Sequence, residues 1–346
     1  MRIVVDVSAL SHPRTGVGNY IRGSLAGLAE AGGGHELVAF APASRDGRRA
    51  IEVALAGIDV ERVLPVLPAA HAVRTAWSRI GRPPVERFVG ALDVFHFGDW
   101  MYPPQRGGLR STMVHDLVPL HHPEWVHPRT KRMHGVKYRH AARACDVVIV
   151  NSTYTADDVA STLGVPPQRI HVAHPGIGAA FIADGARAEG DYVLAVGTLE
   201  PRKNLANAIA GVRGREFRVV GARGWGGVEA RGEHVTWLGS LADEELARQY
   251  RGAAAFVYPS RLEGFGMPVV EAMSCGTPVV ASAHPSLDDA CGGVAVRADP
   301  DDPDSIAAAI DEAVARRDEL VPRGLEHARR FTWEANARAH LEAWSA

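Results

Sequence analysis

Short runs of apolar residues alternate along the chain with stretches whose apolar residues recur at helical spacing. In the first half the runs predict strands over residues 3–7, 37–41, 94–97, 111–115 and 147–151. A helical stretch over about 19–31 follows the first run. Apolar runs without polar alternation are typical of parallel strands covered by helices on both faces. The first half is therefore predicted to be an α/β unit.

The same alternation begins again after residue 190. Apolar runs there predict strands over residues 192–196, 217–221, 235–238, 254–258 and 278–282. Helical spacing separates them and continues over 304–317 and 324–345. A Gly-containing, polar stretch near 178–190 divides the two halves, so we expect one domain over 1–180 and a second over 181–330.

Composition supports an ordinary globular protein. The 346 residues are 46% hydrophobic and 23% charged, and the length predicts about two domains. No apolar run reaches the roughly 18 residues of a membrane span, and the first residues run directly into a strand. Three cysteines form no CxxC motif. We expect a cytoplasmic protein without a signal peptide.

Charge is divided unevenly between the halves. Residues 1–180 hold 20 Lys and Arg against 15 Asp and Glu (20 − 15 = +5), and residues 181–346 hold 18 against 25 (−7). The most basic stretch has four arginines on one predicted helix face: Arg129, Arg132, Arg139 and Arg143. This face predicts contact with anionic lipid or with a diphosphate acceptor, or it is a solvated face. Aromatic residues do not interleave with these charges, so nucleic acid is not expected as a partner.

Arg202 and Lys203 follow the predicted strand 192–196 and precede a helix. A planar guanidinium beside a compact ammonium suits a pyrophosphate, and a helix N-terminus adds amide donors. The alternative is a basic turn at a helix start without a ligand.

A second candidate segment begins at Glu263, which ends a loop after the predicted strand 254–258. Gly264 and Gly266 let backbone amides approach a ligand, and Glu271 lies on the helix that follows. Carboxylates accept hydrogen bonds from sugar hydroxyls, although the segment could also serve only to cap a buried helix. The spacing of the two acids spans roughly 12 Å of helix, which disfavours a glycosidase pair.

The first half offers weaker candidates. Gly16 and Gly18 follow the first strand, but position 21 is not glycine, so the dinucleotide-binding pattern is incomplete. His115 ends the predicted strand 111–115, and Asp116 follows it. The many histidines nearby match no metal-site spacing, and the Asp-Pro-Asp at 299–301 fits a turn, so no metal is expected.

The segments GTLEPRKN (197–204) and EGFGMPVVEAMSCGTPVVAS (263–282) together resemble retaining glycosyltransferases of family 4, also called group 1. The resemblance covers nearly the whole chain. DVSALSHPRTGVGNY (6–20) and MVHDLVPL (113–120) resemble the bacterial branch that makes cell-surface polysaccharides. The family resemblance implies a GT-B fold, in which two Rossmann-like parallel-sheet domains face a central cleft. The first would bind the acceptor and the second the donor, with a helix over 331–346 crossing back onto the first.

The resemblance also implies roles for individual residues. Arg202 and Lys203 would neutralise the donor diphosphate, and Glu263 would hold the donor sugar. With His115 beside the transferred sugar, these four form the implied catalytic set. The implied donor site further includes Gly16, Gly18, Gly264, Phe265, Gly266, Met267 and Glu271. His115 and Asp116 would meet the acceptor.

The function implied by the resemblance is metal-independent, retaining transfer of a hexose from a nucleotide-diphospho-sugar to a glycan or lipid-linked saccharide. Mannose or a deoxyhexose is favoured, with GDP-mannose as first choice. No cofactor is expected, and peripheral contact with the inner face of the cytoplasmic membrane is an open expectation. Two alternatives are a non-catalytic nucleotide-sugar-binding subunit and an NAD-dependent α/β dehydrogenase, against which the incomplete glycine pattern counts.

Overall fold

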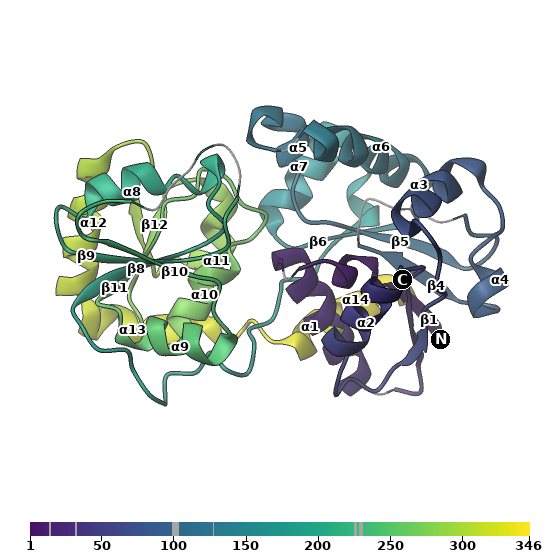
Figure 1. Ribbon diagram of the computed structural model, residues 1–346, viewed down its shortest axis with the longest axis horizontal. Helices are drawn as coiled ribbons and strands as arrows, with labels where there is room; N and C mark the ends of the chain where they lie inside the picture. Colours follow the sequence, from purple (N-terminus) through teal and green to yellow (C-terminus); the bar gives the residue numbers. More distant parts are fainter. Residues whose placement is uncertain (14, 32, 99–103, 127, 225–226, 228–230) are drawn as a thin grey trace. The chain divides into compact units, whose positions relative to one another are not determined.

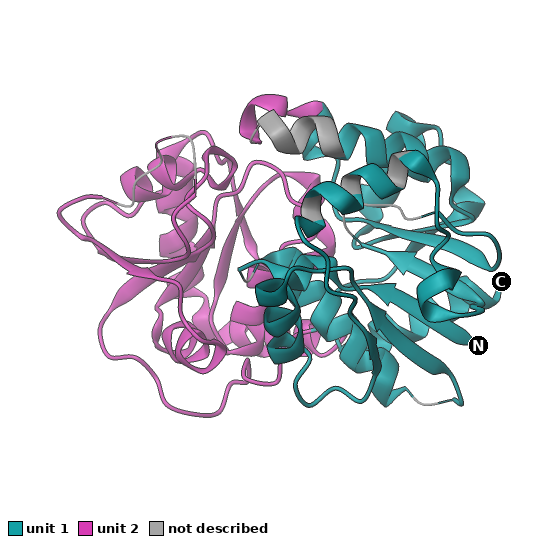
Figure 2. Ribbon diagram, turned by 45° about the vertical axis from the view of Figure 1, so that its right-hand side comes forward, with its two compact units in different colours: residues 1–120, 128–176, 332–346 teal, residues 121–127, 177–331 magenta. Residues whose placement is uncertain are grey.

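Two parallel β-sheets organise the chain in a computed structural model (Figure 1). The structure describes residues 1–346 apart from 14, 32, 99–103, 127, 225–226 and 228–230, and apart from the helical side chains of 71, 75, 78–79 and 128–133. The chain forms two compact units (Figure 2). Unit 1 contains residues 1–120, 128–176 and 332–346, and unit 2 contains residues 121–127 and 177–331. The grouping of 121–127 with unit 2 was not predicted.

Unit 1 contains a seven-stranded sheet in the order β3-β2-β1-β4-β5-β6-β7. Its strands are β1 (Arg2–Asp6), β2 (Glu36–Phe40), β3 (Glu61–Val63), β4 (Val94–Phe97), β5 (Leu109–Val114), β6 (Val147–Val150) and β7 (Ile170–Val172). One face is covered by α1 (Gly16–Glu30), α2 (Arg45–Ala54) and α14 (Trp333–Ser345). The other is covered by α3 (Ala70–Ile80), α4 (Glu86–Val89), α6 (Pro128–Ala144) and α7 (Thr153–Leu163), and the short α5 (Val118–His121) follows β5. Successive residues of β1 enter opposite cores, as strand geometry requires.

Unit 2 contains a six-stranded sheet in the order β10-β9-β8-β11-β12-β13. Its strands are β8 (Tyr192–Val196), β9 (Glu216–Val220), β10 (Val235–Gly239), β11 (Ala255–Tyr258), β12 (Val279–Ser282) and β13 (Val296–Ala298). On one face lie α9 (Asp243–Gly252), α10 (Met267–Ser274) and α11 (Asp288–Cys291), with α13 (Arg317–Ala328) against α10. On the other lie α8 (Leu205–Gly211) and α12 (Pro303–Ala315).

All strand pairs of both sheets are parallel, which confirms the predicted α/β class. In each sheet the strand order reverses beside a central strand, β1 in unit 1 and β8 in unit 2. Ligands of such sheets bind at the carboxyl ends of the strands near this reversal. The loops after β1 and β8 therefore lie where a site is expected.

Two helices differ from the prediction. The first begins at Gly16 rather than near residue 19, because the Thr15 side chain accepts a hydrogen bond from the Gly18 amide at 3.2 Å and caps the helix. The single helix predicted over 324–345 is wrong. Helix α13 ends at Ala328 and α14 begins at Trp333, since Thr332 caps α14 by accepting from the Ala335 amide at 3.0 Å.

Buried polar side chains join α14 to the sheet of unit 1. Ser111 accepts a hydrogen bond from Trp344 Nε1 at 2.8 Å, and its Oγ lies 2.9 Å from His96 Nδ1. The rings of His96 and His340 meet edge to face at 5.4 Å. Burial lowers the pKa of His340 to about 4 and that of His96 well below its usual value. Both imidazoles are therefore neutral in the folded protein at neutral pH.

Acidification is expected to destabilise unit 1. Between about pH 6.5 and pH 4, His340 binds a proton when unfolded but not when folded, so stability falls as pH falls, by about 1.4 kcal/mol per pH unit. Burial also lowers the pKa of His96, so His96 acts in the same direction. Melting curves from pH 7 to pH 5 measure the effect, and His340→Gln should flatten it, whereas His234→Gln at an exposed position should not. A melting midpoint that does not change from pH 7 to pH 5 would contradict the assignment.

Candidate functional site

A single turn at the carboxyl end of β8 carries Arg202 and Lys203. Residues Pro201–Lys203 form a 3-10 turn that leads into α8 through Asn204, whose φ of 55° lies in the left-handed region. The Asn204 side-chain amide donates to the carbonyl oxygens of Pro259, at 3.2 Å, and Pro300. The turn is thereby tied to the loop after β11, which holds the backbone of both cations in place.

Both cations converge on Glu263. Lys203 Nζ lies 2.6 Å from Glu263 Oε1 and donates to the Tyr258 hydroxyl at 2.8 Å. Arg202 Nη1 lies 2.7 Å from Glu263 Oε2, and Arg202 Nη2 lies 2.9 Å from Glu200 Oε1. The result is a cluster of two cations and two carboxylates, drawn from the loops after β8 and β11, whose formal charges cancel.

The cluster is buried. Glu200 is 4% exposed and Glu263 is 6% exposed, and Ser260 donates a further hydrogen bond to Glu263 Oε1. Burial on its own raises the pKa of Glu263, but Arg202 and Lys203 outweigh it and hold this pKa at about 2. Burial lowers the pKa of Lys203, and Glu263 opposes that effect. The Glu263 carboxyl is therefore ionised at neutral pH and keeps the two cations close together.

The loop after Glu263 is shaped by its glycines and its neighbours. The Glu263 amide donates to Ser286 Oγ at 3.0 Å. Gly266 has a φ of 101°, and a Cβ there would lie 2.6 Å from Leu287 Cδ2, so any other residue would be strained at this position. Phe265 is 2% exposed and its ring packs against Phe331. Gly266 and Phe265 thus fix the course of the backbone in this loop.

Glu271 lies on α10, which begins at Met267 directly after Gly266. It is 7% exposed, and its Oε2 accepts a hydrogen bond from the Tyr250 hydroxyl at 3.3 Å. The two glutamates of the segment therefore have different surroundings. Glu263 forms ion pairs with two cations, whereas Glu271 accepts a hydrogen bond from a tyrosine hydroxyl.

In unit 1, the predicted glycines lie at the start of α1, after the loop that follows β1. A Cβ on Gly16 would meet nothing within 4 Å, and a Cβ on Gly18 would make only ordinary contacts. Unit 1 itself therefore has no steric need for glycine at either position, which leaves room for a ligand close to the backbone.

His115 follows β5 and packs edge-on against Tyr20, with ring centroids 5.2 Å apart. Its Nε2 is buried and has no hydrogen-bond partner among the described residues. Burial lowers the pKa of His115 to about 3, and the charges of Lys137 and His134 add to this. Asp116 Oδ1 accepts a hydrogen bond from the Val118 amide at 3.0 Å. His115 is thus a neutral imidazole whose buried Nε2 has no hydrogen-bond partner among the described residues, which marks it as a candidate group for a ligand.

The other predictions have mixed outcomes. Arg139 and Arg143 are exposed on α6, while the side chains of Arg129 and Arg132 lie outside the described residues. The Asp301 amide donates to Asp299 Oδ1 at 2.9 Å, which is the predicted turn. Among the described residues, no three His, Cys, Asp or Glu side chains gather as metal ligands would. No helix in the described part of the chain is both long and apolar enough to span a bilayer.

The sequence analysis did not predict Glu200, which belongs to the cluster. It also missed Tyr258 and Ser260, which form hydrogen bonds to members of the cluster. Glu200 stands two residues before Arg202, so a carboxylate beside two cations was a visible signal. Tyr258 ends a buried strand and reads as core, and Ser260 reads as loop. Only the folded chain brings these groups to Glu263.

Two family models match the chain, one in each half, and a known protein is similar over nearly its whole length. Residues 14–181 match the family model described as Glycosyltransferase Family 4, and residues 190–316 match the one described as Glycosyl transferases group 1. The O-antigen chain mannosyltransferase B of Escherichia coli is 29% identical, over 96% of this chain and 97% of that protein.

Solved structures with the same fold cover the whole chain. A sucrose-phosphate synthase from Thermosynechococcus elongatus superposes with a TM-score of 0.72 at 19% identity, over 100% of this chain and 98% of that one. HepE of Anabaena in complex with UDP and glucose superposes with a TM-score of 0.70 at 16% identity, over 100% and 99%.

Proposed function

The chain belongs to glycosyltransferase family 4 and has the GT-B fold, and we propose that it transfers a hexose with retention of anomeric configuration. The donor would be a nucleotide-diphospho-sugar and the acceptor a glycan or lipid-linked saccharide. Mannose is favoured because the Escherichia coli relative is a mannosyltransferase. The observation that carries the proposal is the buried cluster of Arg202, Lys203 and Glu263 at the carboxyl edge of the unit 2 sheet.

The cluster suits a leaving diphosphate. Arg202 presents a planar fork and Lys203 a compact ammonium, and both are fixed before any substrate arrives. Positive groups fixed in advance stabilise the charge that develops on the leaving group without reorganising during the reaction. Since these side chains supply the positive charge, the proposed reaction uses no metal ion.

Glu263 has two proposed tasks. Its ion pairs position Arg202 and Lys203, and the remaining lone pairs of its oxygens accept hydrogen bonds from hydroxyls of the donor sugar. The backbone amides of Phe265, Gly266 and Met267, with Gly264 before them, would line the sugar and the phosphates. Glu271 would accept hydrogen bonds from the ribose.

Unit 1 would contribute the remaining groups. The space beside Gly16 and Gly18 allows the start of α1 to approach the donor or the acceptor closely. Nε2 of neutral His115, which has no hydrogen-bond partner among the described residues, would bond a sugar hydroxyl, and Asp116 would meet the acceptor. In the proposed reaction the acceptor oxygen bonds to the anomeric carbon on the face from which the diphosphate oxygen departs, and the acceptor proton passes to the departing diphosphate.

Thermal shifts with GDP, UDP, ADP and dTDP test this proposal. At a concentration one hundred times its dissociation constant, a nucleotide stabilises its binding site by about 2.7 kcal/mol. We expect GDP to give the largest rise in the melting midpoint of the wild type. In the Lys203→Ala variant, GDP should raise the midpoint much less. A rise with NADH alone would instead favour a dehydrogenase. Binding of the sugar nucleotide without transfer or hydrolysis would favour a non-catalytic subunit.

A further inference from the structure

We propose that Asn151 is a further sugar-binding residue, which acts together with His115 on an uncharged pyranose ring. Both residues belong to unit 1. The pairing of the two side chains is argued from the contacts of unit 1 alone. The assignment of the bound ring to the acceptor rests on the proposed function.

Asn151 and His115 directly follow two neighbouring strands. Strand β5 ends at Val114 and β6 ends at Val150, and these two residues are partners in the parallel pairing. On each strand the residue before the last packs in the core that the sheet shares with α1 and α14. Because side chains alternate along a strand, the residues that follow β5 and β6 share this face. Asn151 is therefore the neighbour of His115 at the carboxyl edge of the sheet.

Tyr20 of α1 spans the two strands on either side of β6. Its ring packs edge-on against His115, with centroids 5.2 Å apart, and its hydroxyl donates to the Ala173 carbonyl oxygen at 3.1 Å. Ala173 directly follows β7, and its amide donates to the Val150 carbonyl oxygen at 2.8 Å. Since β6 lies between β5 and β7, Tyr20 crosses the end of the strand that Asn151 follows. Asn151 thus stands in the row between His115 and Ala173.

The Asn151 carboxamide is buried, but the protein does not use its oxygen. Asn151 is 7% exposed, and its Oδ1 has no hydrogen-bond partner among the described residues. The same holds for Nε2 of His115. A buried polar atom without a partner costs free energy, so two such atoms on neighbouring strands call for an explanation. Hydrogen bonds to the hydroxyls of a bound sugar would satisfy both.

The chemistry of the pair favours hydroxyls over charged groups. A carboxamide carries no charge, and His115 is a neutral imidazole because burial lowers its pKa to about 3. The Asn151 oxygen accepts, and the ring nitrogen donates or accepts according to its tautomer, whereas a hydroxyl can do both. Phosphate oxygens only accept, and proteins usually meet them with Arg or Lys. The pair thus suits adjacent hydroxyls of a neutral sugar, which in the proposed reaction belongs to the acceptor.

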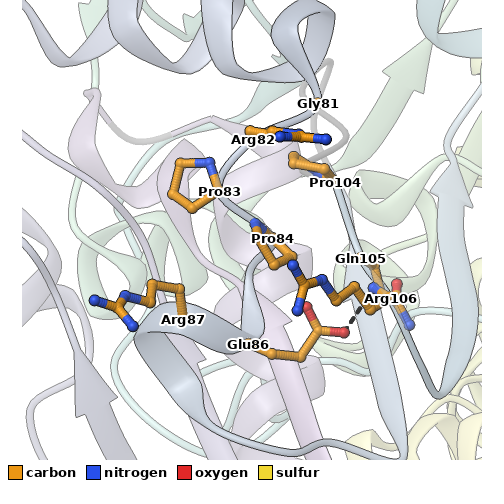
Figure 3. A pocket seen from close by; sticks show the side chains of 9 residues that line it. All are labelled: Gly81, Arg82, Pro83, Pro84, Glu86, Arg87, Pro104, Gln105 and Arg106. Carbon is orange, nitrogen blue, oxygen red and sulfur yellow. Dashed lines mark hydrogen bonds between the residues drawn. The ribbon is translucent and has the colours of Figure 1, made fainter.

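A hollow of about 740 Å³ in unit 1 differs from the pair in chemistry and in place (Figure 3). Arg82, Arg87 and Arg106 line it, and the segments that carry them precede β4 and β5. The hollow therefore lies toward the amino ends of these strands, whereas Asn151 and His115 follow the carboxyl ends. Since Arg87 is exposed and belongs to the hollow, its replacement is a control for sugar binding at the pair.

Asn151→Leu separates a ligand-binding role from a structural one. Leucine has a similar size and leaves no polar atom unsatisfied, so the variant should melt at or above the wild-type midpoint. Asn336→Leu is the matched control, because Asn336 is a buried asparagine of the same unit whose amide donates to the Tyr20 hydroxyl at 3.0 Å and the His174 carbonyl oxygen at 2.8 Å. The control should melt several degrees lower. If Asn151→Leu melts as low or fails to fold, Asn151 is structural and the proposal is overturned.

Saturation-transfer NMR of the full chain with methyl α-D-mannopyranoside, with and without GDP, measures sugar binding. We expect Asn151→Leu to weaken the binding about threefold to tenfold, the usual effect of losing one neutral hydrogen bond, and Arg87→Ala to bind like the wild type. The methyl pyranosides of glucose, galactose and rhamnose are measured in parallel. Binding of none of the four sugars by the wild type would overturn the proposal. Equal binding by the wild type and Asn151→Leu, or a loss in Arg87→Ala alone, would also overturn it.

The GDP thermal shift separates this proposal from the proposed function. Asn151 belongs to unit 1 and Lys203 to unit 2, so Asn151→Leu should keep the full rise in midpoint with GDP. Sugar binding that depends on Asn151 in a protein that transfers no sugar would support the pair and contradict the transfer reaction. Transfer by a protein whose sugar binding does not depend on Asn151 would contradict the pair alone.

Discussion

Lys203→Ala is expected to lower kcat/KM for sugar transfer by about a hundredfold to a thousandfold, the usual cost of removing one group that stabilises a developing negative charge. Its ammonium lies 2.6 Å from Glu263 and 2.8 Å from the Tyr258 hydroxyl, and its side chain is mostly shielded from solvent. Arg202 would remain alone to meet the diphosphate. Glu263→Gln should cause a loss of similar size, because it frees both cations from their common partner while preserving shape.

Initial rates with a radiolabelled sugar nucleotide and melting curves of the same samples measure this effect. Arg261→Ala is the matched control, because Arg261 belongs to the loop that carries Glu263 but forms a surface ion pair with Asp301. Such pairs contribute roughly 0–1 kcal/mol, so the control should keep its rate within about twofold. Rates near the wild-type value in folded Lys203→Ala would remove the cluster from the mechanism.

Gly27→Ala is expected to lower the free energy of unfolding of the protein. Gly27 lies inside α1, where α14 crosses it, and a Cβ on Gly27 would lie 2.2 Å from the carbonyl oxygen of Trp333. Gly27→Ala must therefore push the two helices apart, which costs about 1–3 kcal/mol or more. In an open helix the same change would stabilise by about 1 kcal/mol, so the sign of the effect is itself informative.

Gly16→Ala is the control on the same helix. A Cβ on Gly16 has nothing within 4 Å, so this variant should melt at or above the wild-type midpoint. Gly27→Ala should melt several degrees lower. If Gly27→Ala is as stable as Gly16→Ala, the packing of α1 against α14 described above is wrong.

Most strands were predictable because each is a short apolar run that needs burial on both faces. The three-residue strands β3, β7 and β13 were not predicted, because so short a run gives no clear apolar pattern and β3 is mostly exposed. Residues 94–97 and 192–196 have the predicted limits as β4 and β8. The break between α13 and α14 was not predictable from spacing, because helical periodicity continues across it. Phe331 is buried in the core of unit 2, whereas Ala337 is buried in that of unit 1, so tertiary packing decides where the chain leaves its helix.

The cations were predictable because Arg202 and Lys203 are neighbours that follow a strand. Their convergence on Glu263 was not, since about sixty residues separate the groups and only the adjacency of β8 and β11 unites them. The structure adds a positioning task that the sequence did not indicate. The Glu263 carboxylate already forms ion pairs with Arg202 and Lys203 when no sugar is present.

The most direct measurement is a crystal structure of the protein grown with GDP. We expect diphosphate oxygens within hydrogen-bonding distance of Lys203 Nζ and the Arg202 guanidinium. GDP bound with its diphosphate elsewhere, while both cations remain directed only at Glu263, would contradict it.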